Sequence, residues 1–295
     1  FMFFIILFVI SFSLFFIFFS YCFHFFLSSY FVNFHLFISI LFFCLGCQFK
    51  FSPSEEQNNH TFQIKRYDRL EYRYLTTGDF SALQQMNTEY PIETRTLIEN
   101  VLKIGEATDP NINTTFLNYY QDTVLQTILA DAEAKYANMD TLNHQLGMAF
   151  AKLKKFLPNI QIPLVYAQIS ALNQSIIVGN QSIGISLDKY LGTNYALYKH
   201  FDYTEAQRKQ MTKEYIIPDV LSYYLMSLYP MKGFETCPQN DRDLHVGRIQ
   251  WVVNQALGCH FFKNKFVENV DNFMRRNPQI TYVQLLRSDN ISNSK

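Results

Sequence analysis

Residues 1–49 contain no lysine, arginine, aspartate or glutamate, and this uncharged stretch constrains the chain more than any other feature. Phenylalanine, leucine and isoleucine dominate it. An apolar stretch of this length exceeds what the core of a small soluble domain takes up, and it is typical of a segment that enters a membrane. All 25 basic and 25 acidic residues follow it, so we expect the water-exposed fold to lie in the remainder of the chain.

The apolar stretch closes on the sequence Leu45-Gly46-Cys47. A small residue directly before a cysteine resembles the lipobox of a bacterial lipoprotein signal, in which the signal peptide is removed ahead of the cysteine and lipid is attached to its sulfur. The resemblance implies lipid attachment at Cys47, with residues 1–46 serving as an address rather than as structure. Because lipoproteins carry several acyl chains, such an anchor is effectively permanent.

Three observations leave the nature of this leader open. A secretory signal normally begins with a basic segment, which residues 1–49 lack, and the stretch is too long for one apolar signal core. The chain also begins with phenylalanine, which favours a gene model extended upstream of a true signal at approximately Phe31–Gly46. The alternative is a membrane hairpin of two apolar spans, Phe3–Leu27 and Phe31–Leu45. The mass of the mature N-terminus distinguishes these interpretations.

The rest of the chain divides into a polar tether, residues 47–59, and one domain, residues 60–295, which is long enough to bury an adequate core. Its charges balance and no run of like charge stands out. Nucleic-acid-binding proteins are expected to carry a basic face, so that class is excluded. Cys237 and Cys259 lie in this domain; in an exported protein they either form a disulfide or remain as two thiols.

The spacing of apolar residues changes twice along the domain. Residues 94–157 show helical spacing, which Pro158 ends. Residues 162–169 form an apolar run typical of a buried strand, and two more apolar runs flank Gly179-Asn180, a two-residue hairpin signal. Helical spacing then returns up to the C-terminal region. We therefore predict an α+β fold, a mainly helical single domain with a small antiparallel β-hairpin or meander between two helical blocks.

Local signals add detail at both ends of the domain. Alternating residues in His60–Tyr74 predict an edge strand. Thr204 and Thr281 each begin a capping-box pattern, and Pro218 suits the first turn of a helix. Gly258 follows a helical stripe and is expected to end that helix.

No motif of a named reaction is present. The sequence contains no His-Glu-x-x-His, no Gly-x-Ser-x-Gly elbow, no phosphate loop and no Gly-x-Gly-x-x-Gly. Cys237, His245, Cys259 and His260 do not have the spacing of zinc ligands. We therefore predict no catalytic residue, no metal site and no cofactor, and we identify no small-molecule substrate.

The most distinctive strings are Gly184–Tyr198 (GISLDKYLGTNYALY) and Met211–Val220 (MTKEYIIPDV). Through them the chain resembles the gliding-motility lipoproteins of Bacteroidota, the GldB family, over residues 60–295. The resemblance implies a lipid-anchored protein of the cell envelope, on the periplasmic side or in the outer membrane. We expect such a protein to act without enzymatic activity, through contacts with other envelope proteins.

Eight residues of these strings are candidates for an interaction site, and we call them the motif residues. They are Asp188, Lys189, Tyr190, Gly192, Tyr198, Glu214, Tyr215 and Asp219. Because the two strings lie close in sequence, across a hairpin and the start of a helix, we expect them to form one contiguous surface or groove.

Two alternatives remain. The order of a hairpin followed by two helices is similar to that of zinc peptidases, which implies a degenerate zincin-like scaffold and a metallopeptidase relative with residual or altered activity. Glu214–Asp219 would then occupy the metal-binding helix, but this segment has no imidazole, and likeness of fold alone does not grant activity. The other alternative is a two-span membrane protein.

Overall fold

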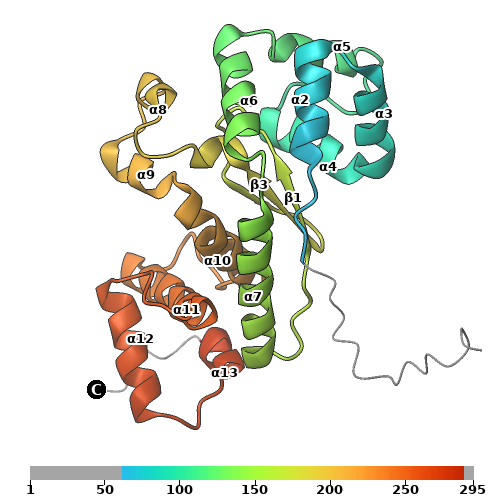
Figure 1. The fold of residues 1–295 in the computed structure, drawn as a ribbon. Coiled ribbons are helices and arrows are strands. Elements are labelled where there is room, and N and C mark those ends of the chain that lie inside the picture. The colour runs from blue at the N-terminus through green and yellow to red at the C-terminus, as the bar shows by residue number, and fades with distance from the viewer. Residues whose placement is uncertain (1–61, 289–295) are drawn as a thin grey trace, which may run out of the picture. The chain divides into compact units, whose positions relative to one another are not determined.

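The structure is a computed structural model that describes residues 62–288 (Figure 1). These residues belong to one compact unit, His60–Lys295. The predicted leader (residues 1–46), the tether (residues 47–59) and Cys47 lie outside the described residues, as do both spans of the alternative membrane hairpin. Among the helices of the described part, none is both long and apolar enough to cross a membrane.

Helices precede and follow a small sheet. Those before it are α2 (Tyr67–Thr77), α3 (Phe80–Glu89), α4 (Pro91–Thr96), the π-helical η1 (Leu97–Leu102), α5 (Ile112–Tyr119), α6 (Thr123–Lys135) and α7 (Asp140–Phe156). Those after it are the 3₁₀-helix η2 (Leu187–Tyr190), α8 (Ala196–His200), α9 (Glu205–Gln210), the 3₁₀-helix η3 (Lys213–Tyr215), α10 (Ile216–Leu228), α11 (Gln239–Leu257), α12 (Lys265–Arg276) and α13 (Tyr282–Arg287).

The predicted helical blocks and their local signals are confirmed. Helices fill most of residues 94–157, and α7 ends two residues before Pro158. The side chains of Thr204 and Thr281 both form complete capping boxes. Gly258 adopts φ 73° after α11, a left-handed conformation that glycine takes without steric cost.

The sheet consists of β1 (Leu164–Gln168), β2 (Ile176–Val178) and β3 (Ser182–Ser186) in the order β1-β3-β2. The hairpin of β2 and β3 is antiparallel, as predicted, but β1 pairs in parallel with β3. The expectation of a fully antiparallel meander is therefore wrong. Apolar runs indicate that strands exist, but their order depends on how the chain turns after β1, which their spacing does not encode.

The turn of the hairpin also differs from the prediction. The Gly179 N–H donates to the Ser182 carbonyl at 2.8 Å, so Asn180 and Gln181 occupy the turn. Gln181 takes a positive φ of 60°. The turn thus lies one residue later than the Gly179-Asn180 signal indicated.

The edge strand predicted within His60–Tyr74 is wrong for most of its described length. Only Lys65 pairs with the sheet, through hydrogen bonds of 2.8 Å with the main chain of Val165 and Ala167. The chain then enters α2, whose buried residues include Tyr67, Leu70, Glu71 and Tyr74. Their spacing of three to four residues is that of a helix buried on one face, and it outweighs the short alternation that suggested a strand.

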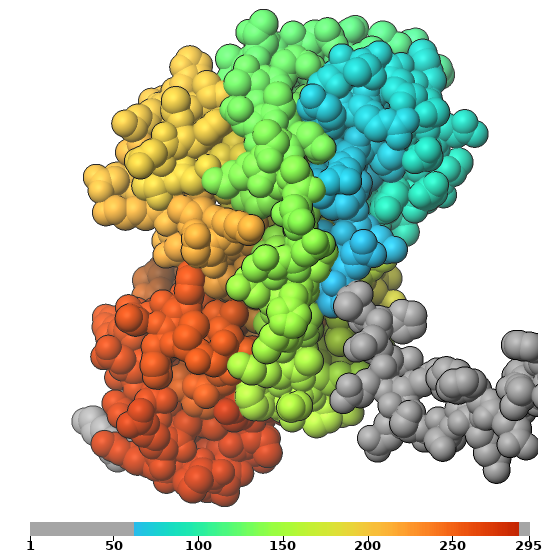
Figure 2. Space-filling model, viewed as in Figure 1, coloured from blue at the N-terminus to red at the C-terminus, as the bar shows by residue number. Residues whose placement is uncertain are grey.

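Helices from both ends of the domain pack against the strands of the sheet. Helix α2 lies against β1, and α10 contacts both β2 and β3. Helix α7 contacts α10 and α11, and in Figure 2 it forms a band between the N-terminal and the C-terminal helices. A sheet of three short strands in mixed orientation does not support the zincin-like scaffold.

Candidate functional site

Asp188 is fully buried and holds the turn that follows β1. Its carboxylate accepts hydrogen bonds from the Leu172 N–H at 2.6 Å and the Ser170 N–H at 3.1 Å. Between them, Ala171 has φ 49°, and Leu172 itself has φ 65°. Burial raises the pKa of Asp188, and the bonds from the Leu172 and Ser170 N–H groups oppose that rise. The side chain therefore stabilises an unfavourable backbone turn and is not directed at solvent.

Two neighbouring motif residues reinforce the same region. The buried Tyr198 hydroxyl donates to the Asp188 carbonyl at 2.6 Å and accepts from the Leu191 N–H at 2.8 Å. Lys189, which is half-buried, donates to the Tyr203 hydroxyl at 2.8 Å. Hydrogen bonds thus connect residues within the string Gly184–Tyr198 and tie the string to the loop after β1.

The second string joins the first at Asp219. The Tyr190 hydroxyl, at the end of η2, donates a 2.8 Å hydrogen bond to the Asp219 carboxylate in the first turn of α10. Gly192 contributes a main-chain bond, from its N–H to the Met211 carbonyl at 2.8 Å. Burial raises the pKa of Asp219 to about 6, against the opposing effect of the Tyr190 hydrogen bond.

The remaining motif residues lie nearer the surface. Glu214 is exposed, and a hydrogen bond with the Thr212 side chain lowers the pKa of its carboxyl. The Tyr215 ring packs edge-on against Phe261, with ring centroids 4.8 Å apart. Tyr190 is buried, like Asp188 and Tyr198. The structure therefore brings the two strings into contact, but several of their motif residues are buried in the interior of the domain.

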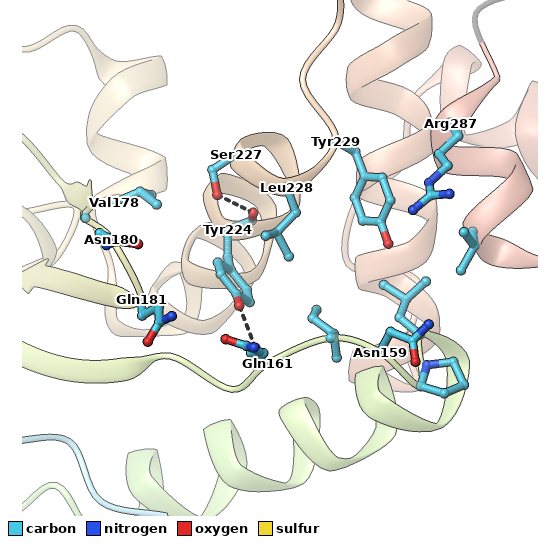
Figure 3. Close-up of a pocket in the computed structure, with 15 residues that line it drawn as sticks. Asn159, Gln161, Val178, Asn180, Gln181, Tyr224, Ser227, Leu228, Tyr229 and Arg287 are labelled. Atoms are coloured by element: carbon cyan, nitrogen blue, oxygen red, sulfur yellow. Dashed lines mark hydrogen bonds between the residues drawn. The ribbon is translucent and has the colours of Figure 1, made fainter.

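A separate open pocket of about 640 Å³ lies between four segments of the chain (Figure 3). The segments are the loop after α7, the tip of the β2–β3 hairpin, the C-terminal end of α10 and helix α13. The lining residues are Leu157, Pro158, Asn159, Ile160, Gln161, Val178, Gly179, Asn180, Gln181, Tyr224, Ser227, Leu228, Tyr229, Val283 and Arg287.

Hydrogen bonds fix one wall of the pocket. The Tyr224 hydroxyl donates to the Gln161 carbonyl, which joins α10 to the loop after α7, and the Ser227 hydroxyl donates to the Tyr224 carbonyl at 2.7 Å. In Figure 3, Tyr229 and Arg287 lie together on the opposite side of the pocket from Asn180 and Gln181. Sequence reasoning missed this pocket, because its lining comes from segments that only tertiary packing brings together.

The cysteine and histidine residues within residues 62–288 form no comparable site. Cys237 and Cys259 both carry free thiols. His245 is buried, and its Nδ1 lies 3.3 Å from the guanidinium of Arg248. Within residues 62–288 no three histidine, cysteine, aspartate or glutamate side chains are placed to hold a metal ion together.

Comparison with known proteins places the chain in a family. The family model described as gliding motility protein GldB matches residues 49–266, which include both strings and most of the lining of the pocket but not Val283 and Arg287. No curated protein matches the chain, and no solved structure does. The family is one of gliding-motility lipoproteins rather than a known enzyme family, which indicates association with the cell envelope. The chain belongs to the GldB family of gliding-motility lipoproteins.

Proposed function

We propose that this protein is held to a membrane of the cell envelope by lipid on Cys47 and acts by binding other envelope proteins, without turning over a substrate. The observation that carries the proposal is the open pocket, because apolar side chains remain exposed around it. Leu228 in the lining is 44% exposed. Ile162 and Leu164 are 44% and 43% exposed. The Leu164 N–H donates to the carbonyl of the pocket residue Gln181 at 3.0 Å, which places it beside the pocket.

Exposed apolar side chains gathered around a concave surface are typical of protein-binding sites. The burial of the motif residues points the same way. The carboxylate of Asp188 accepts from main-chain N–H groups of its own fold, and the phenol of Tyr198 is bonded to main chain on both sides. Because these two side chains are already hydrogen-bonded to the main chain of the domain, their role is to stabilise it. Glu214, the one member of the set that is exposed, remains available to a partner as a second point of contact.

Site-directed crosslinking in intact cells tests the proposal. A photoreactive amino acid is placed at Leu228, and for comparison at Ile92 in α4, which is 70% exposed and lies outside the pocket lining. We expect discrete crosslinks to envelope proteins from position 228 and none of the same products from position 92. Identical crosslinking patterns at the two positions would remove the support for a specific docking site.

Three further measurements test the anchor and the absence of turnover. Mass spectrometry of the mature N-terminus should find a lipid-modified Cys47, and retention of residues 1–46 would contradict this. Metal analysis and a peptide-hydrolysis assay on the purified protein should find neither stoichiometric zinc nor cleavage. Either one would favour the metallopeptidase alternative.

A further inference from the structure

We infer that the pocket binds an extended segment of a partner protein in which an acidic side chain stands next to apolar residues. This inference rests on the proposed function and deepens it, because it names the chemistry of the partner at the same site.

The positive charge in the pocket favours an occupant with a negative charge. Arg287 is the only charged residue among the lining residues, and it is exposed. With the other described residues Arg287 forms no ion pair or hydrogen bond. Its charge reaches the neighbouring phenol, since it opposes the rise in the pKa of Tyr229 that burial causes. A guanidinium in this state, next to an apolar wall, is suited to bind a carboxylate through two parallel hydrogen bonds.

The main chain of the hairpin selects an extended occupant. β2 is one of the two outer strands of the sheet, and it pairs with β3 on one side only. The Gly179 N–H donates to the Ser182 carbonyl, and the Ser186 N–H donates to the Ser175 carbonyl. Because hydrogen-bonded residues alternate in an antiparallel pair, the N–H and C=O of Val178 point away from β3. Val178 lines the pocket, so an extended chain entering there can pair with these groups, as peptides do in strand addition.

The distance between the two features sets the length of the segment. Arg287 lies on the opposite side of the pocket from the hairpin tip (Figure 3). An occupant that reaches both must therefore be several residues long and extended. The lining also includes the apolar side chains of Ile160, Leu228 and Val283, which favour apolar residues in the bound segment.

A peptide-selection experiment tests the inference. A displayed library of random octapeptides is selected against the full-length protein purified in detergent, and binding of the enriched peptides is measured by fluorescence polarisation. We expect enrichment of aspartate or glutamate next to apolar residues. Arg287→Ala should weaken binding about tenfold, the order expected for loss of one charge-assisted contact, and Arg287→Lys should weaken it less. Arg276→Ala changes an exposed arginine of α12 outside the pocket and should leave binding unchanged.

Other outcomes overturn the inference. A selection without acidic enrichment, or equal binding by the protein and its Arg287→Ala variant, rejects the acidic partner. Binding that appears only after removal of residues 289–295 identifies the chain's own C-terminal segment as the occupant. Self-association abolished by Arg287→Glu identifies a second copy. If crosslinks from Leu228 persist while peptides show no dependence on Arg287, only this inference fails and the proposed docking function stands.

Discussion

The hydroxyl of Tyr190 donates a 2.8 Å hydrogen bond to the carboxylate of Asp219, and this bond ties the 3₁₀-helix that follows the sheet to the first turn of α10. The two residues belong to the two strings that carry the family resemblance. Their contact shows that the strings form one structural unit, in which the loop after β1, η2 and the start of α10 hold each other in place.

The first prediction concerns the pH dependence of stability through Asp219. Burial raises the pKa of this carboxyl in the folded state to about 6, from its ordinary value of 3.8. The folded state therefore binds the proton more tightly than the unfolded state. The contribution of protonated Asp219 to stability is fully present below the ordinary pKa of 3.8, and it is lost as the pH rises to about 6. The loss is on the order of 1–3 kcal/mol.

Urea unfolding at a series of pH values measures this effect. Asp219→Asn should flatten the decline between about pH 4 and 6 relative to the unmodified protein. Glu71 and Asp188 also have raised pKa values, so the difference between the two proteins, and not the absolute curve, isolates Asp219. Parallel curves for the two proteins would contradict the prediction.

The second prediction is that Asp188→Ala destabilises the domain by about 2–4 kcal/mol. The substitution leaves the buried N–H groups of Ser170 and Leu172 without their acceptor, in a turn whose backbone is already unfavourable. Urea unfolding checks this, with Glu89→Ala as the control because Glu89 is exposed at the end of α3. The control should change stability by less than about 0.5 kcal/mol. Equal effects of the two substitutions would mean that Asp188 does not hold the turn.

The third prediction concerns Gly184, which sits on β3 beneath the ring of Tyr166. A Cβ added at this glycine would lie 2.7 Å from the ring and hydroxyl of Tyr166, closer than real Cβ atoms approach. Gly184→Ala should therefore destabilise the domain by about 1–3 kcal/mol through overpacking. Tyr166→Leu shortens the opposing side chain, so the double variant should be more stable than the sum of the two single changes indicates. Additive effects would show that the close approach is not the cause.

The fourth prediction links a helix cap to the pocket. The Thr281 side chain caps α13, the helix that carries Val283 and Arg287 into the lining. Thr281→Ala should destabilise this helix by about 1 kcal/mol, and Thr281→Ser should restore the cap. Hydrogen exchange of the α13 amides measures the local effect, and faster exchange in the alanine variant alone is the expected result. Faster exchange in both variants would point to loss of the threonine methyl group instead.

Several features could be predicted from the sequence because they depend on nearby residues. The capping boxes at Thr204 and Thr281 use side chains three residues apart, and the left-handed residue at Gly258 ends a helix by its own backbone freedom. The helical blocks and the β-hairpin were likewise visible in the spacing of apolar residues. The family could be inferred from strings of adjacent residues.

Other features could not be predicted, because they depend on residues far apart in the chain. The insertion of β3 between β1 and β2 follows a turn that Asp188 holds from a position 16 to 18 residues away. The burial of Asp188, Tyr190 and Tyr198 depends on the helices that cover them, so no local pattern separates them from surface residues.

The sequence by itself determined the helical blocks, the hairpin, the helix ends and the family, since these are recorded in neighbouring residues and in their periodic spacing. Only the tertiary structure decided the order of the strands, the interior position of several motif residues, and the pocket that both Gln161 and Arg287 line. The physical reason is that burial and cavities arise from long-range packing, in which each contact depends on the placement of elements that are distant in the chain.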